Sequence, residues 1–150
     1  MESIALALGW AGIFSPVALG AAGSIVGCAR AGQAACGALL ETESGYGRFI
    51  GLSAMPSSQT IYGIVVMLTL NRPVTLETAP GLFGIGLLAG IALMMSGIYQ
   101  GYAVASAIHV SKSKEEIFGL SITPAAVVEG FAVFAFVFAL FLAGTLPGEM

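Results

Sequence analysis

The residue best suited to carry chemistry in this sequence is a lone carboxylate within an apolar segment. Glu129 is the only charged residue from position 117 to position 148, and the stretch around it reads PAAVVEGFAVFAFVFALFLAG (124–144). A charged carboxylate at the centre of a membrane helix costs at least about 2.5 kcal/mol, and such residues mark ion pathways and proton relays. Glu129 is therefore the first candidate for a binding residue.

Two carboxamides are predicted to lie at the same depth as this carboxylate. Gln59 follows Arg48 by about ten residues, Gln100 precedes the charged segment 111–116 by about ten, and Glu129 follows that segment by about thirteen. At 1.5 Å per residue, each lies about 15–20 Å from those charges. Oxygen ligands with a single negative charge suit a hard monovalent cation, either Na⁺ or a proton on the carboxyl itself.

Helix breakers and hydroxyls near Gln59 add further oxygen ligands. Pro56 removes a backbone hydrogen bond, so nearby carbonyls can turn toward an ion. Tyr62 follows Gln59 by three residues on the same helix face and can donate its hydroxyl to a carboxylate. The alternative is that Ser58, Gln59 and Gln100 only join helices, as polar residues in membranes often do.

The composition shows which solvent surrounds these residues. The 150 residues are 57% apolar and only 9% charged, with a mean hydropathy of +0.96, whereas soluble domains carry about 25% charged residues. The chain is therefore embedded in a membrane, and its net charge of −3 excludes a basic surface for nucleic acid. No catalytic triad, phosphate loop, haem motif or metal cluster occurs, so we expect no catalytic site of its own and no organic cofactor.

Charge-free stretches predict an all-α membrane protein with four transmembrane helices. These stretches are residues 3–29, 49–71, 81–108 and, apart from Glu129, 117–148. They form two tandem hairpins, 1–72 and 73–150, in which segments 31–48 and 109–116 are expected to be the hairpin loops.

The two hairpins are also related as a parallel repeat. LSAMP (52–56) and LSITP (120–124) share Leu, Ser and Pro, and this alignment places Ile61 where Glu129 stands. The first hairpin is therefore expected to lack the carboxylate, so that the chain carries one ion site.

The basic residues predict how the chain is oriented. Arg30, Arg48, Lys112 and Lys114 lie in or beside the hairpin loops, whereas the opposite side has only Arg72. The positive-inside rule then places both hairpin loops in the cytoplasm and both termini outside.

Glycine spacing predicts how the helices assemble. Glycine pairs four residues apart (Gly23/Gly27, Gly86/Gly90 and Gly97/Gly101) line the first and third helices, whereas the other two are bulkier. Small residues let helices approach closely. A hairpin with one thin and one broad helix, repeated around an axis, closes into a ring with the thin helices inside.

Two motifs carry a resemblance to a known family. MPSSQTIYG (55–63) and SGIYQG (96–101) resemble helices 2 and 3 of the proteolipid rotor-ring subunit, called K or c, of V-type rotary ATPases, in particular bacterial sodium-pumping members. The resemblance implies that an ion is held by Glu129, by the amide oxygens of Gln59 and Gln100, by the Ser58 hydroxyl and by the Met55 backbone carbonyl. It also implies that Tyr62 locks the carboxylate.

The resemblance further implies partners and a location. We expect a ring of roughly ten copies in lipid, a stator membrane subunit (a/I) and a central-stalk subunit that contacts loops 31–48 and 109–116. The membrane would be a bacterial plasma membrane, and other subunits would hydrolyse ATP. Na⁺ is favoured over H⁺, although Gly130 and Phe131 depart from the sodium pattern. A four-helix channel and a structural assembly protein are the rival functions.

Overall fold

The structure, a computed structural model, describes residues 1–148, and these residues form four long helical segments. The first and third are the continuous helices α1 (Glu2–Glu41) and α4 (Ala79–Ser113). The second consists of α2 (Tyr46–Ser53), the 3₁₀ helix η1 (Met55–Ser57) and α3 (Ser58–Leu70). The fourth consists of the 3₁₀ helix η2 (Glu115–Ile117) and α5 (Phe118–Ala143).

All four segments are long and apolar enough to cross a membrane. The prediction of an all-α membrane protein with four transmembrane helices is therefore confirmed. The last two residues of the predicted second hairpin lie outside the described residues.

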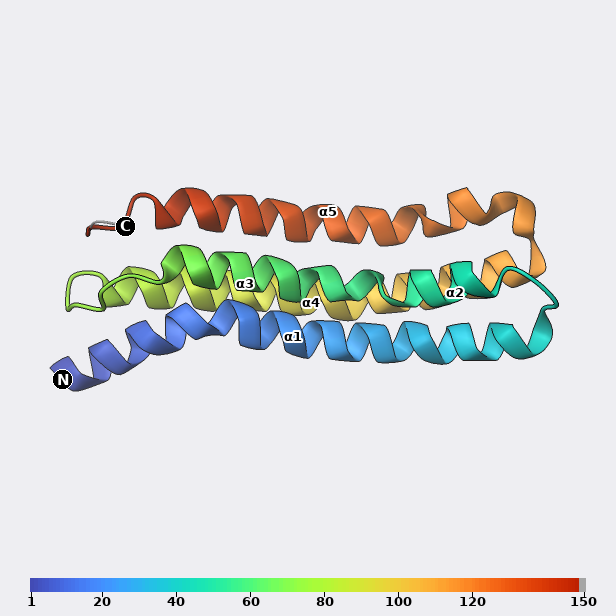
Figure 1. Ribbon diagram of the computed structural model, residues 1–150. Helices are drawn as coiled ribbons and strands as arrows, with labels where there is room; N and C mark the ends of the chain where they lie inside the picture. The colour runs from blue at the N-terminus through green and yellow to red at the C-terminus, as the bar shows by residue number, and fades with distance from the viewer. Residues whose placement is uncertain (149–150) are drawn as a thin grey trace.

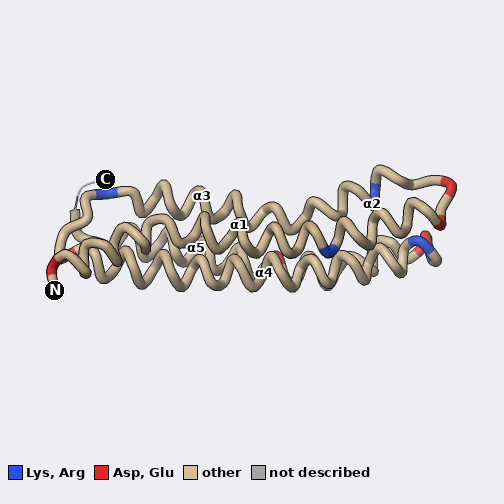
Figure 2. The backbone as a smooth tube through the Cα atoms, turned by 90° about the horizontal axis from the view of Figure 1, so that it is seen from below, with Lys and Arg blue, Asp and Glu red and all other residues tan. Residues whose placement is uncertain are grey.

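The segments run side by side along one axis (Figure 1). The helix α1 lies along one side of the bundle and α5 along the other, with α3 and α4 between them. The start of α1 and the end of α5 lie near the turn 71–78, at what we call the terminal end. The links 42–45 and Lys114 lie at the opposite end, called the loop end. Figure 2 shows that most Lys, Arg, Asp and Glu residues lie toward these two ends.

The prediction that 31–48 and 109–116 are loops was wrong for most of their residues. The helix α1 continues to Glu41 and α4 continues to Ser113, so the first hairpin turns within residues 42–45 and the second at Lys114. The physical reason is the alanine content of the α1 extension, because alanine has the highest helix propensity. The alanines also pack in a buried cluster with side chains of α2, α4 and α5; this cluster contains Ala31, Ala34, Ala35, Ala38, Phe49, Leu52, Val104, Ile108 and Ala125.

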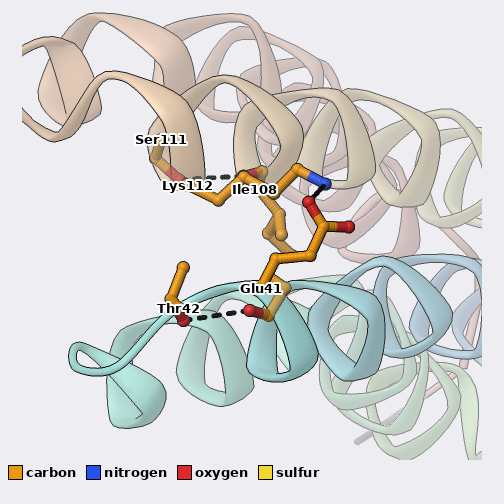
Figure 3. A network of polar contacts seen from close by, with 6 residues as sticks. Glu41, Thr42, Ile108, Ser111 and Lys112 are labelled. Atoms are coloured by element: carbon orange, nitrogen blue, oxygen red, sulfur yellow. Dashed lines mark hydrogen bonds and ion pairs between the residues drawn. The ribbon is translucent and has the colours of Figure 1, made fainter.

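Two ion pairs join the helices at the loop end. The Lys112 Nζ lies 2.6 Å from a carboxylate oxygen of Glu41, which connects α4 to α1 (Figure 3). The Arg48 guanidinium lies 2.5 Å from a carboxylate oxygen of Glu115, which connects α2 to η2. Exposed ion pairs contribute only about 0–1 kcal/mol each, so they align the helix ends more than they stabilise the fold.

Glycine contacts bring α1 and α4 together along most of their length. A Cβ added at Gly86 would overlap the backbone of Gly12, and one added at Gly101 would overlap the backbone of Gly27. Backbone therefore packs directly on backbone at these positions, as the small-residue pattern predicted. The contacts also fix the register of the two parallel helices, and with it the height of every residue on α4 relative to α1.

Candidate functional site

The break in the second helical segment exposes oxygen atoms at the start of α3. Pro56 has no backbone N–H, and the chain passes through the 3₁₀ turn of η1 before α3 begins at Ser58. The Ser58 backbone N–H and hydroxyl both donate to the Met55 carbonyl, the hydroxyl at 3.1 Å. The sequence thus brings the Met55 carbonyl and the Ser58 hydroxyl together beside Gln59.

A chain of hydrogen bonds then runs from α3 through α4 to α5. The single hydrogen of the Ser58 hydroxyl is shared between the Met55 carbonyl and Gln59 Oε1, which lies 3.3 Å from the hydroxyl oxygen. Gln59 Nε2 donates to Gln100 Oε1 at 3.1 Å. Gln100 Nε2 in turn donates to Glu129 Oε2 at 3.0 Å. Both glutamines are fully buried. Side chains predicted to share one layer are therefore in direct contact.

Tyr62 contacts the other oxygen of the carboxylate. Its hydroxyl donates to Glu129 Oε1 at 3.0 Å, and its ring stacks on Phe136 of α5 with the ring centroids 5.3 Å apart. Each oxygen of Glu129 therefore accepts a hydrogen bond, one from α3 and one from α4. The structure has the contact that a carboxylate lock needs.

Ser96 belongs to this network, although its place in the sequence did not single it out. Its hydroxyl accepts a hydrogen bond from Gln59 Nε2 at 3.2 Å and donates to the Val128 carbonyl at 3.1 Å, and the residue is 7% exposed. Ser96 precedes Gln100 by four residues, so both lie on one face of α4. This spacing within SGIYQG was the signal that could have identified it.

The negative charge of Glu129 is met by hydrogen bonds rather than by an ion pair. Among residues 1–148, no Lys, Arg or His nitrogen lies within 4.0 Å of its carboxylate. The described residues also hold no group of three or more His, Cys, Asp or Glu that could bind a metal ion. The groups that contact the Glu129 carboxylate are the uncharged Tyr62 hydroxyl and Gln100 amide. The further oxygens of the network, on Met55, Ser58, Gln59 and Gln100, are also uncharged, which suits a singly charged ion better than a divalent one.

Comparison with known proteins identifies the family. The sequence model for the C subunit of ATP synthase matches residues 11–70 and, a second time, residues 83–142. The chain belongs to the family of ATP synthase C subunits. Within this proteolipid, the first match covers most of α1 to α3 and the second most of α4 and α5, as expected for a tandem hairpin repeat.

Two relatives refine the comparison. This proteolipid is 32% identical over 139 residues to the A-type ATP synthase subunit K of Methanocaldococcus jannaschii; the match covers 89% of this chain and 62% of the relative, so the chain spans less than two thirds of that protein. It is 30% identical over 141 residues to the V-type sodium ATPase subunit K of Enterococcus hirae, with 91% of this chain and 87% of the relative covered. The predicted resemblance to a V-type proteolipid subunit K is confirmed.

Proposed function

We propose that this chain is a rotor-ring subunit that carries one Na⁺ per copy across the membrane at Glu129, while other subunits of the complex hydrolyse ATP. The observation that supports this most strongly is the buried hydrogen-bonded chain between Ser58 and Glu129 on three helices. The proposed ligands are the Glu129 carboxylate, the amide oxygens of Gln59 and Gln100, the Ser58 hydroxyl and the Met55 carbonyl. Tyr62 would hold the carboxylate in place.

The spacing of the oxygens supports a cation. The Ser58 hydroxyl oxygen lies 3.1 Å from the Met55 carbonyl oxygen and 3.3 Å from Gln59 Oε1. Oxygen ligands about 2.4 Å from a hard cation in octahedral geometry lie about 3.4 Å from one another. The three oxygens now share the hydrogen of the Ser58 hydroxyl. Small side-chain rotations would therefore let them coordinate one ion instead.

Na⁺ explains the site better than H⁺ does. A proton needs only the carboxyl, whereas each buried amide or hydroxyl that loses its partners destabilises the site by about 1–3 kcal/mol. The proton alternative has its own support, because the Tyr62 hydroxyl and the Gln100 amide already satisfy both oxygens of Glu129 without an ion. Gly130 and Phe131 also differ from the sodium pattern.

The mechanism follows from the charge of the site inside lipid. When Na⁺ is bound, the site is neutral overall and can face hydrocarbon, whereas the empty carboxylate is charged and cannot do so at acceptable cost. An empty site would therefore be stable only beside a basic residue of the stator subunit, where ions are loaded and released. This difference makes rotation and ion movement depend on each other.

The ring proposal rests on the shape of the hairpins. The glycine contacts make α1 and α4 the thin helices, whereas α5 exposes large apolar side chains such as Phe131, Phe134 and Phe138. Roughly ten copies would place α1 and α4 inside and the other segments outside, facing lipid and the stator. With the loop end in the cytoplasm, the central stalk would contact the turns at 42–45 and Lys114 and the adjoining helix ends.

Protection from carbodiimide labelling tests the ion. Dicyclohexylcarbodiimide reacts with a protonated carboxyl in an apolar site, so Glu129 of the purified ring should be labelled in the absence of sodium. Added NaCl should protect it, and KCl at equal ionic strength should not. Labelling that follows pH alone and ignores NaCl would make the site a proton site. A Glu129 that is not labelled under any condition would contradict ion carriage by this residue.

A further inference from the structure

A hydrogen bond between two hydroxyls joins α1 to α3 beside the ion site, and neither hydroxyl is a proposed ligand. The Thr60 hydroxyl donates to the Ser24 hydroxyl at 2.8 Å. Ser24 is only 5% exposed, and Thr60 directly follows Gln59, so the bond lies at the height of the buried amides. Among residues 1–148, it is the only side-chain hydrogen bond that joins α1 to α3. We call this pair, Ser24 and Thr60, the α1/α3 pin.

Glycine contacts on both sides of the pin bring α1 and α3 close together. A Cβ added at Gly20 would lie 2.7 Å from the backbone oxygen of Gln59, and one added at Gly63 would overlap the carbonyl of Pro16. These contacts fix the distance between the two helices. A glycine has no side chain that would stop one helix from turning against the other, whereas a hydrogen bond depends on direction. The pin therefore restrains the rotation of α3 where the glycines do not.

The helix α3 needs such a restraint more than the long helices do. It has 13 residues and begins directly after the 3₁₀ turn of η1, in which Pro56 cannot donate a backbone hydrogen bond. By contrast, α1 and α4 are continuous over 40 and 35 residues. Because the helical hydrogen bonds are interrupted at η1, α2 does not fix how α3 is rotated. Contacts with the neighbouring helices must do so.

The rotation of α3 decides where its two site residues point. Successive residues lie about 100° apart around a helix, so Thr60 lies about 100° to one side of Gln59 and Tyr62 about 60° to the other. While Thr60 is held on α1, the Gln59 amide reaches Gln100 at 3.1 Å. In the same rotation, the Tyr62 hydroxyl reaches Glu129 at 3.0 Å. A turn of α3 that broke the pin would displace both donors from their acceptors.

We propose that Ser24 and Thr60 are positioning residues for the ion site. They hold α3 in the rotation at which Gln59 and Tyr62 reach their partners on α4 and α5. This inference rests on the proposed ion site at Glu129 and extends it to α1, which supplies no ligand. The affinity of the site would then depend on a hydrogen bond within the first hairpin, which lacks the carboxylate.

Protection of Glu129 from carbodiimide labelling by sodium, measured on the purified ring, tests the pin. Thr60→Val keeps the branched shape of the side chain and removes the hydroxyl. It should raise the sodium concentration for half protection about fivefold, which corresponds to about 1 kcal/mol. Thr60→Ser restores the hydroxyl and should return this concentration to within about twofold of the wild type. Ser24→Ala removes the acceptor and should match Thr60→Val, and it decides the matter if Thr60→Val fails to assemble.

The matched control is Thr69→Val, the same chemical change on the same helix. The Thr69 hydroxyl donates to the Val65 carbonyl of its own helix at 2.9 Å, so this variant should keep the wild-type sodium dependence. The double variant Ser24→Ala/Thr60→Val should be no worse than either single variant, because both changes remove the same bond. Effects that add, or a lower melting temperature of Thr60→Val with an unchanged sodium dependence, would overturn the proposal.

The same assay separates this inference from the identity of the ion. A wild-type ring that NaCl does not protect would refute sodium as the ion, and the pin is then judged by the pH at which half of Glu129 is labelled. Thr60→Val should shift this pH by about 0.5 unit relative to the wild type, because the Tyr62 hydroxyl would lie further from the carboxylate. Thr69→Val should not shift it. A labelling profile that Thr60→Val leaves unchanged would refute the pin.

Discussion

Replacement of Gln100 by alanine should weaken sodium binding more than any other single amide change in the chain. Gln100 is fully buried and makes three hydrogen bonds: it accepts one from Gln59, and it donates one to Glu129 Oε2 and one to the Ala125 carbonyl at 3.3 Å. Gln100→Ala removes all of these together with one proposed ion ligand. Gln59 keeps its bond to Ser96, so the rest of the network should survive.

The size of the effect follows from the type of bond that is lost. A hydrogen bond to a charged group contributes about 1.5–3 kcal/mol, and the neutral bonds contribute about 1 kcal/mol each. The Ala125 carbonyl is not a proposed ligand, so we expect loss of this bond to lower the stability of the fold rather than the affinity for sodium. At least about 1.4 kcal/mol should be lost from sodium binding, so the sodium concentration for half protection should rise at least tenfold.

The assay is carbodiimide labelling of Glu129 in the purified ring over a range of NaCl concentrations, with KCl added to keep ionic strength constant. The matched control is Gln33→Ala, the same chemical change at an exposed glutamine outside the site. The control should keep the wild-type sodium dependence. A Gln100→Ala ring that is protected at the same sodium concentration as the wild type would refute the role of this amide as a ligand.

Three further changes separate ion carriage from packing. Glu129→Gln should abolish ion transport by the whole complex in a flux assay while native mass spectrometry still shows an assembled ring; transport at a near-normal rate would make Glu129 structural. Ser96→Ala should raise the sodium requirement by only about two- to fivefold, because Gln59 loses one neutral partner of about 0.5–1 kcal/mol; a labelling titration checks this, and an unchanged midpoint would remove Ser96 from the site. Gly86→Ala should destabilise the ring by about 1–3 kcal/mol, because the added methyl group overpacks against α1. Gly84→Ala is the control and should not destabilise it, since a Cβ there has nothing within 4 Å. Equal melting temperatures of the two variants would contradict the backbone contact.

The contact between Gln59, Gln100 and Glu129 could be predicted because it follows from the number of residues that separate each of them from the charged segments at the loop end. A helix rises by a constant length per residue, so the number of residues from the loop charges gives the depth of a side chain along the helix axis. Three polar residues at similar separations from those charges must therefore lie in the same layer. Ser96 was not predicted as part of the site, because a single serine in a helix can bond to its own helix backbone. Only the structure shows that its hydroxyl bonds to α5 instead.

The ends of the helices could not be predicted from charge alone. Arg30 marks where the apolar stretch ends, but it does not end α1, which runs eleven residues further to Glu41. A helix stops where its backbone loses favourable packing, and the alanines after Arg30 keep that packing against α2 and α4. Charge therefore marked the end of the apolar stretch, whereas packing of small side chains carried the helix beyond it.

One short motif connects the packing of the hairpins to the ion site. In SGIYQG, Ser96 precedes Gly97 and Gln100 precedes Gly101, and adjacent residues point about 100° apart around a helix. Both glycines pack on the backbone of α1, so the serine and the glutamine must turn to the neighbouring face, where α3 and α5 lie. The close contact with α1 thus orients the polar pair of α4 and sets its height relative to Gln59. For this reason a bulky residue at Gly97 or Gly101 should disturb ion binding even though neither glycine offers a ligand.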